Sequence, residues 1–463
     1  MAPPDHAVRD KDKAGHKARC KVKRNGKRIV IVGAGLAGCW LARFLAEAGR
    51  PVLVIDAADA PAQGASGNAV GVVKPQLLRQ PSVAETFHLR CFDFLRNELH
   101  SRGWAEAVGF HEVGVLQFTR ERWTGHARAR SVDSEEQRHL SGLPLPDGLH
   151  ALWLPEAGFL APARLCRQLL DHPGIETRFD VAVDVPFPSS KASGSPTDPH
   201  ASLGLDADEP LVLCVGAGRR AFGIGTNGTA LAPDPNSLRL GMVPARGQID
   251  ACDGETMPRT VIAGHRYLIP AGNTLWCGAS FVRDDVNLAS RDSERAENLT
   301  AARAWLASAE ATVTEATVTE TATTKTAVTE AAAADGRKDR AQHSATSRVA
   351  VRATTHDRLP LVGTLPDVDR LRESHADLRH GRPNQVFPPI PRTDNTWILG
   401  GLGSRGIVTS AWCAQQLARQ LLGEIGVTAH DDSESTEVTD AQLRELLEPA
   451  RLVLRQLRRG LPS

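Results

Sequence analysis

The feature that most constrains the fold is a glycine pattern between two apolar segments. Residues 28–32 (RIVIV) predict a short buried strand, and residues 39–49 have the apolar periodicity of a helix that ends at a glycine. The segment IVGAGLAG between them has the Gly-x-Gly-x-x-Gly spacing of a tight strand-to-helix turn. A second buried strand follows at residues 51–56, so the ordered chain begins as a βαβ unit.

The residues of this turn are suited to bind a dinucleotide. Gly33 permits the tight turn, Gly35 lets backbone amides approach a pyrophosphate, and Gly38 lets the helix pack on the sheet. The positive end of the helix then faces the phosphate charge. A carboxylate at the end of the second strand accepts hydrogen bonds from ribose hydroxyls. The dinucleotide-binding residues predicted for this unit are Gly33, Ala34, Gly35, Ala37, Gly38 and Asp56.

Two later glycine clusters favour FAD over NAD as the dinucleotide. The predicted strand at 210–218 runs into glycines that include Gly216, and LGGLGSRGI (399–407) precedes a predicted helix at 408–422. Three separated segments that converge on one long cofactor suit FAD. Amides at the start of the last helix suit the negative charge of a reduced flavin. The residues of the last cluster that we expect to contact FAD are Gly403, Ser404, Arg405 and Gly406.

The composition excludes several classes of protein. Hydrophobic residues make up 41% of the chain and charged residues 24%, which excludes a wholly disordered chain. No apolar run approaches the ~18–20 residues that a membrane helix needs. The eight cysteines include no Cys-x-x-Cys pair, so we predict no metal site. Because the chain shows no secretion signal, we expect free thiols and a cytoplasmic location.

The charge of the chain is unevenly distributed. The net charge is only +1, yet residues 1–28 carry ten Lys or Arg against three Asp. We interpret residues 1–26 as a disordered basic arm that either contacts a polyanion or is simply solvated.

Two internal segments have a biased composition. Residues 311–347 repeat a phrase of Thr, Val, Glu and Ala, and residues 186–209 are rich in Pro, Ser and Gly. Both segments are predicted to be insertions that contribute nothing to a core.

Four further segments carry a resemblance to a known family. They are GASGNAVGVVKPQL (64–77), GFLAP (158–162), VRATTHDRLPLVG (351–363) and LGSRGI (402–407). With the glycine turn, they resemble the D-amino-acid-oxidase-like flavoproteins, which include glycine oxidase and sarcosine oxidase. The narrower resemblance is to the FAD-dependent oxidoreductase module of bifunctional tRNA 5-methylaminomethyl-2-thiouridine biosynthesis proteins. It runs from about Lys27 to the end of the chain, apart from the two insertions.

The resemblance implies a fold of class α/β, an α+β flavoprotein with two domains. A Rossmann-like FAD-binding domain is expected from residues 27–85, 155–243 and 355–425. An antiparallel-sheet substrate domain is expected from 86–154 and 244–354, interleaved with the first. A basic C-terminal helix is predicted within 426–463, where residues 441–460 carry five Arg against two Glu. The family also places the GASGN loop near the flavin, which adds Ser66, Gly67 and Asn68 to the expected FAD contacts.

The chemistry that the resemblance implies is oxidation of a C–N bond beside a carboxylate. On a carboxymethylaminomethyl uridine of tRNA, the products are an aminomethyl uridine and glyoxylate. The expected cofactor is FAD, and the expected partners are tRNA and a small-molecule electron acceptor, with molecular oxygen among the candidates. No methyltransferase half precedes Gly33 in this sequence. We therefore expect this chain to perform only the oxidation, with any methylation supplied by a separate protein.

Two residues are the expected catalytic residues. Arg352 stands where glycine oxidase has its carboxylate-binding arginine, and a planar guanidinium holds a carboxylate with two hydrogen bonds. Tyr267, the single tyrosine of the chain, stands where the family often has a hydroxyl that helps to hold the same group. A surface arginine and a packing aromatic are the alternatives for these two positions. Lys74 follows the GASGN loop, and Arg405 precedes the predicted helix at 408–422. The roles of these two residues stay open.

Two other functions stay open at this stage. One is an oxidase or dehydrogenase of free glycine, sarcosine or a D-amino acid, which belongs to the same chemical class. The other is a catalytically silent, flavin-bound protein that binds tRNA. The basic arm and the Arg-rich C-terminus favour a nucleic acid partner over free amino acids. The sequence leaves open the electron acceptor, the oligomeric state and the set of tRNAs.

Overall fold

The structure is a computed structural model, and most of the chain from Gly26 to Gly460 is described. The described residues are 26–123, 126, 128–181, 200, 203–206, 208–214, 240–252, 257–306, 346–381, 384–424 and 438–460. The predicted basic arm up to Asn25, nearly all of the predicted insertion at 311–347, most of the one at 186–209, and Gly216 lie outside these residues.

A parallel sheet forms around the predicted βαβ unit. Its strand order is β16-β17-β9-β1-β2-β8, and β1 pairs in parallel with both β2 and β9. Strands β9 and β17 come from distant parts of the chain, and β16 is an antiparallel edge strand. The bounds are β1 (Ile29–Val32), β2 (Val52–Ile55), β8 (Ile175–Arg178), β9 (Leu211–Leu213), β16 (Leu361–Pro366) and β17 (Arg392–Gly400).

Both faces of this sheet are covered, which explains why its central strands are apolar without alternation. Ile29 and Ile31 pack with the helices on one face, while Val30 packs on the other. The first face meets α1 (Leu36–Glu47), α4 (Pro162–Leu170) and α9 (Gly406–Leu421); the second meets α8 (Val368–Ser374) and α11 (Arg451–Arg458). The first helix begins at Leu36, earlier than the predicted Cys39, because Gly35 is its N-cap.

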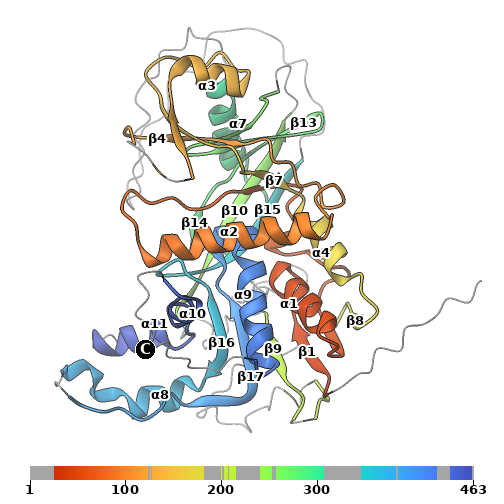
Figure 1. The fold of residues 1–463 in the computed structure, drawn as a ribbon, viewed down its shortest axis with the longest axis vertical. Coiled ribbons are helices and arrows are strands. Elements are labelled where there is room, and N and C mark those ends of the chain that lie inside the picture. The colour runs from red at the N-terminus through yellow and green to blue at the C-terminus, as the bar shows by residue number, and fades with distance from the viewer. Residues whose placement is uncertain are drawn as a thin grey trace, which may run out of the picture.

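A second, mostly antiparallel sheet lies at the other end of the molecule (Figure 1). Its order is β14-β10-β13-β12-β11-β4-β6-β5, and β15 pairs with the free edge of β10. Helices α7 (Asp292–Leu306) and α3 (Ser134–Ser141) pack on it. Its strands are β4 (Val115–Thr119), β5 (Arg130–Val132), β6 (His150–Leu154), β10 (Met242–Cys252), β11 (Val261–Ala263), β12 (Tyr267–Ala271), β13 (Thr274–Gly278), β14 (Val282–Arg283) and β15 (Ser347–Thr355).

The predicted fold class is confirmed: a Rossmann-like parallel sheet is joined to a mostly antiparallel second sheet. The residue boundaries of the two predicted domains stay a prediction.

Helix α2 (Val83–Ser101) crosses the middle of the molecule and packs against α9 (Figure 1). A two-stranded antiparallel sheet, β3 (Gly71–Val73) with β7 (Gly158–Leu160), also lies there. Strand β15 runs directly from the second sheet into the turn before β16. Among the described residues, no helix has the length and apolarity to span a bilayer.

The prediction of one continuous helix at 441–460 is wrong. The segment forms two helices, α10 (Asp440–Leu446) and α11, because Pro449 lacks an amide donor and interrupts the helical hydrogen bonds. Arg451 of α11 is buried and pairs with Asp357, and Arg455 pairs with the same carboxylate. These two cations therefore dock the helix on the protein, which weakens the earlier inference that the C-terminal arginines meet tRNA.

Candidate active site

The turn after β1 has the geometry that its glycines predict. Gly33 has a φ of +113°, and a Cβ there would lie 2.5 Å from the carbonyl oxygen of Cys214. A Cβ on Gly38 would overlap the carbonyl oxygen of Gly33. Helix α1 therefore begins close against the end of β1, and the amides of its first turn are directed to the space beyond the strand.

Two side chains from other segments hold this turn. The amide of Ala34 donates a 2.6 Å hydrogen bond to Asp56 at the end of β2. The amide of Leu36 donates to the hydroxyl of Ser66 at 3.0 Å, so the GASGN loop reaches the first turn of α1. Ala37 lies in that first turn, and Gly67 and Asn68 follow Ser66 in the loop. The structure thus brings together the predicted residues of segments 33–38, 56 and 66–68.

An arginine that the sequence analysis missed connects this loop to the second sheet. Arg348 of β15 donates hydrogen bonds to the carbonyl oxygens of Gln63 and Gly64, at 3.2 and 3.0 Å. A Cβ on Gly67 would overlap its guanidinium. The alternation of Arg348, Ala350 and Arg352 along a predicted strand was the available signal, because it places both arginines on one face.

Arg352 projects from β15 across its neighbour β10. Ala245 is its partner in the register, and a Cβ on the next residue of the same face, Gly247, would overlap the Arg352 guanidinium. The Nη1 atom of Arg352 is buried without a hydrogen-bond partner. Burial lowers the pKa of Arg352, and among the described residues the group that opposes this shift is Tyr267, not a carboxylate. The guanidinium therefore lies in a space that glycine leaves open, with donors that no described residue accepts.

Tyr267 lies at the start of β12, on the same face of the sheet. It pairs with Gly278 of β13, which in turn pairs with Ile249 of β10. Burial raises the pKa of Tyr267 to about 12, although the charge of Arg352 opposes the shift. The phenol is therefore a neutral hydrogen-bond donor at any physiological pH. The structure brings the two predicted catalytic residues together, and their catalytic roles stay a prediction.

A second group of cations lies at the junction of the two sheets. Gly403–Arg405 forms a 3₁₀ turn just before α9, and β15 packs against this turn. Burial and the charge of Arg405 lower the pKa of Lys74 to about 8. Burial, Arg405 and Lys74 lower the pKa of His88 to about 3, so His88 is neutral. The predicted Gly403, Ser404, Arg405 and Gly406 are thus next to Lys74, and His88 is a neighbour that the sequence analysis missed.

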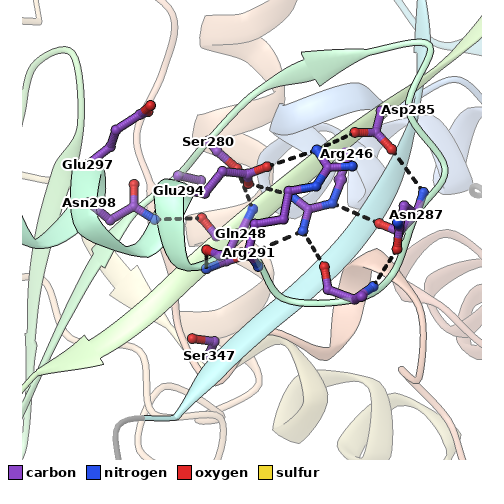
Figure 2. A network of polar contacts seen from close by, with 12 residues as sticks. Arg246, Gln248, Ser280, Asp285, Asn287, Arg291, Glu294, Glu297, Asn298 and Ser347 are labelled. Atoms are coloured by element: carbon purple, nitrogen blue, oxygen red, sulfur yellow. Dashed lines mark hydrogen bonds and ion pairs between the residues drawn. The ribbon is translucent and has the colours of Figure 1, made fainter. Parts of the chain in front are cut away.

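The opposite face of β10 carries a different set of polar residues, shown in Figure 2. Because side chains alternate along a strand, Arg246, Gln248 and Asp250 point away from Arg352 and toward α7. Arg246 forms an ion pair with Glu294 and donates to the carbonyl oxygen of Asn287 at 2.7 Å. The network is completed by Ser280, Asp285, Arg291, Asn298 and Ser347. Within the described residues, no cluster of three or more His, Cys, Asp or Glu is placed to hold a metal ion.

Comparison with known proteins adds a family to this geometry. Residues 28–420 match the family model described as FAD dependent oxidoreductase. A curated relative from Marinobacter nauticus, the tRNA 5-methylaminomethyl-2-thiouridine biosynthesis bifunctional protein MnmC, is 29% identical over 407 residues. That match covers 85% of this chain and 55% of the relative. The protein of the same name from Shewanella amazonensis is 27% identical, with 93% of this chain and 60% of the relative covered. This chain thus spans less than two thirds of these relatives.

Solved structures show the same fold. Glycine oxidase from Geobacillus kaustophilus has a TM-score of 0.57 at 16% identity, over 89% of this chain and all of that one. L-Proline dehydrogenase from P. horikoshii has a TM-score of 0.58 at 11% identity, over 94% of this chain and 99% of that one. At these identities the comparisons support the fold alone.

Proposed function

The chain belongs to the family of FAD-dependent oxidoreductases, and from this premise we propose that it oxidises the carboxymethylaminomethyl group of the tRNA wobble uridine. One observation carries the proposal: among the described residues the guanidinium of Arg352 has no acidic partner, and its Nη1 is buried without a hydrogen-bond partner near Tyr267. Such a site lacks an anion, and a substrate carboxylate supplies one. The relatives that match most of this chain are named for the biosynthesis of a modified tRNA uridine, which supports the choice of substrate.

The residues at two helix N-termini fit FAD. Gly33 and Gly38 let the first turn of α1 begin close against β1, and Gly35 is its N-cap beside the Ser66 hydroxyl. Asp56 stands at the end of β2, where a carboxylate can bind the ribose. The turn at 403–406 and the N-terminus of α9 offer amides to the flavin ring. When bound, FAD supplies the acceptor for a hydride, which no amino acid side chain provides.

The residues of this chain then bind and orient the substrate. Arg352 holds the carboxylate with two hydrogen bonds, and the neutral hydroxyl of Tyr267 donates a third. Two fixed oxygens orient the adjacent methylene, and small errors in that orientation cost large factors in rate. Arg348 donates hydrogen bonds to the carbonyl oxygens of Gln63 and Gly64, and so holds the GASGN loop against β15, the strand that carries Arg352.

The reaction balances with water as the second reactant. In this two-electron oxidation the carboxylate-bearing methylene would lose a hydride, for which bound FAD would supply the acceptor, and the nitrogen would lose its proton, which forms a C=N bond. Water adds to that bond, and the C–N bond breaks to give glyoxylate and the aminomethyl uridine. The final recipient of the two electrons would be a small-molecule acceptor, with molecular oxygen the first candidate.

The test uses purified protein and tRNA that carries carboxymethylaminomethyl uridine. We expect conversion to aminomethyl uridine by nucleoside mass spectrometry, with one glyoxylate released per modified nucleoside. The matched control is Arg352→Met, which should retain FAD and lose the conversion. Free glycine, sarcosine and D-alanine are assayed beside the tRNA.

Two outcomes would contradict the proposal in different ways. Turnover of a free amino acid without turnover of tRNA would establish the alternative of an amino-acid oxidase or dehydrogenase. Retained FAD and tRNA binding, with no flavin reduction by either substrate, would establish a catalytically silent tRNA-binding protein.

A further inference from the structure

An exposed aromatic side chain stands beside the proposed carboxylate site. Phe281 follows β13 and is 48% exposed, although large apolar side chains are usually buried. The Cζ atom of Arg352 lies 6.0 Å from the centroid of the Phe281 ring, over its face. One face of the ring is thus directed to the guanidinium, while about half of the side chain stays exposed to solvent.

The backbone on both sides of Phe281 is held in place. The hydroxyl of Ser280 accepts a 2.8 Å hydrogen bond from the amide of Gln248 and also contacts Glu294, within the network of Figure 2. Val282 and Arg283 pair with Arg246 and Ala245 of β10. The exposure of Phe281 is therefore not that of a loose loop: a rigid strand connection presents the ring to solvent next to Arg352.

The chemistry of the substrate gives this ring a partner. In a carboxymethylaminomethyl uridine, only a methylene, a nitrogen and a second methylene separate the carboxylate from the planar uracil ring. A carboxylate on Arg352 therefore brings the uracil to the neighbourhood of Phe281. Aromatic side chains that stack on bases are the usual means by which proteins hold an unpaired nucleotide.

We infer that Phe281 is a specificity-determining residue that stacks on the planar ring of the substrate's N-substituent. The identity of that ring as uracil rests on the proposed function. The consequence is a preference for N-substituted glycines that carry a planar ring over N-methylglycine, which has only a methyl group for Phe281 to contact. Arg352 then selects the carboxylate and Phe281 selects the ring.

The test measures flavin reduction without oxygen in rapid mixing. The substrates are the carboxymethylaminomethyl uridine nucleoside, N-benzylglycine, N-(cyclohexylmethyl)glycine and N-methylglycine. The readout is the ratio of the apparent dissociation constants of each ring-bearing substrate and N-methylglycine. Phe281→Leu keeps an apolar side chain but removes the aromatic face. This variant should weaken the binding of the planar-ring substrates, relative to that of N-methylglycine, by roughly 5- to 150-fold, which corresponds to the free energy of base–aromatic stacking. N-(cyclohexylmethyl)glycine should be affected least.

Two further variants keep the test decisive. Phe281→Trp keeps a planar ring and should restore or exceed the wild-type preference. Val282→Ala is the matched control, because Val282 pairs with Arg246 and so projects to the opposite face. An unchanged ratio in Phe281→Leu would overturn the inference, even if tRNA is a substrate. A Phe281-dependent preference for N-benzylglycine, with no turnover of the nucleoside or tRNA, would support the stacking role and overturn the proposed function instead.

Discussion

Two arginines on opposite faces of the same pair of strands meet opposite surroundings. Arg246 of β10 is fully buried, and its donors are taken up by Glu294, by the side chain of Gln248 and by two backbone carbonyls. Within the part of the chain that the structure describes, Arg352 of β15 has no carboxylate partner and keeps a buried Nη1 without an acceptor. Since buried polar groups in proteins are normally hydrogen-bonded, the first arginine is complete within the chain and the second is not.

We interpret this contrast as one between a structural charge, Arg246, and a charge proposed to bind substrate, Arg352. A buried cation that its own chain neutralises stabilises the position of its neighbours, here the strand behind the site. A half-buried cation with a buried donor and no acid among the described residues is unfavourable until an anion arrives. The same type of substitution should therefore have opposite consequences on the two faces: loss of stability at Arg246 and loss of substrate turnover at Arg352.

The largest expected effect is on the side of Arg246. Glu294→Gln keeps the shape of the side chain but removes the charge that neutralises a fully buried guanidinium. Breaking one partner of a buried ion pair costs about 3–5 kcal/mol, so the free energy of unfolding should fall by that amount. Denaturant unfolding measures it. The matched control is Glu297→Gln on the same helix, whose carboxylate is 65% exposed and pairs with Arg266. That change should cost at most about 1 kcal/mol. Equal losses in the two variants would remove the contrast.

The next effect tests the space that Gly247 leaves for Arg352. In Gly247→Ala, the new methyl group would overlap the end of a flexible side chain, so the guanidinium moves while the fold remains. A displacement of about 1 Å in a positioning group can cost on the order of a hundredfold in rate. We therefore expect flavin reduction by substrate to slow to that extent, with the bound flavin retained. A wild-type rate of flavin reduction in Gly247→Ala would show that the reaction does not depend on the position of the Arg352 guanidinium.

The smallest effect concerns a third cation, Lys74, which lies near the positive charge of Arg405. Burial and Arg405 lower its pKa from 10.5 to about 8, so below pH 8 the folded protein carries an unfavourable charge. The unfolded chain binds that proton more tightly, which makes the penalty complete below pH 8 and absent above pH 10.5. Lys74→Met should raise the free energy of unfolding by about 1–2 kcal/mol at pH 7, after allowance for partial exposure. The gain should decline as the pH rises toward 10. A gain that does not change with pH would show that Lys74 is not desolvated.

Much of the fold was predictable because its signals are local. The strand–glycine–helix order from residue 28 to residue 56 appears in the structure as β1, α1 and β2. The break in the C-terminal helix was also predictable, since Pro449 is visible in the sequence. Arg352 and Tyr267 were predicted as catalytic residues only through the resemblance to a family, because one arginine and one tyrosine carry no spacing signal of their own.

The rest of the site depends on register between distant strands. Nothing local to Gly247 indicates that it opposes β15, or that its missing side chain makes room for Arg352. The ion pair between Arg246 and Glu294 joins residues 48 positions apart, and the contact of Phe281 with Arg352 spans a longer separation. Such pairings depend on which strands pair and in which register. The alternation of side chains within one strand does not specify either.

The measurement that tests the central claim most directly is flavin reduction by Arg352→Lys in a single anaerobic turnover. Lysine keeps the positive charge but loses the two parallel donors that fix a carboxylate. The account predicts unchanged flavin content, no loss of stability and a rate of flavin reduction about a hundredfold below wild type, with reoxidation unaffected. A wild-type rate of flavin reduction in Arg352→Lys would show that Arg352 does not hold the substrate carboxylate, and would contradict the account.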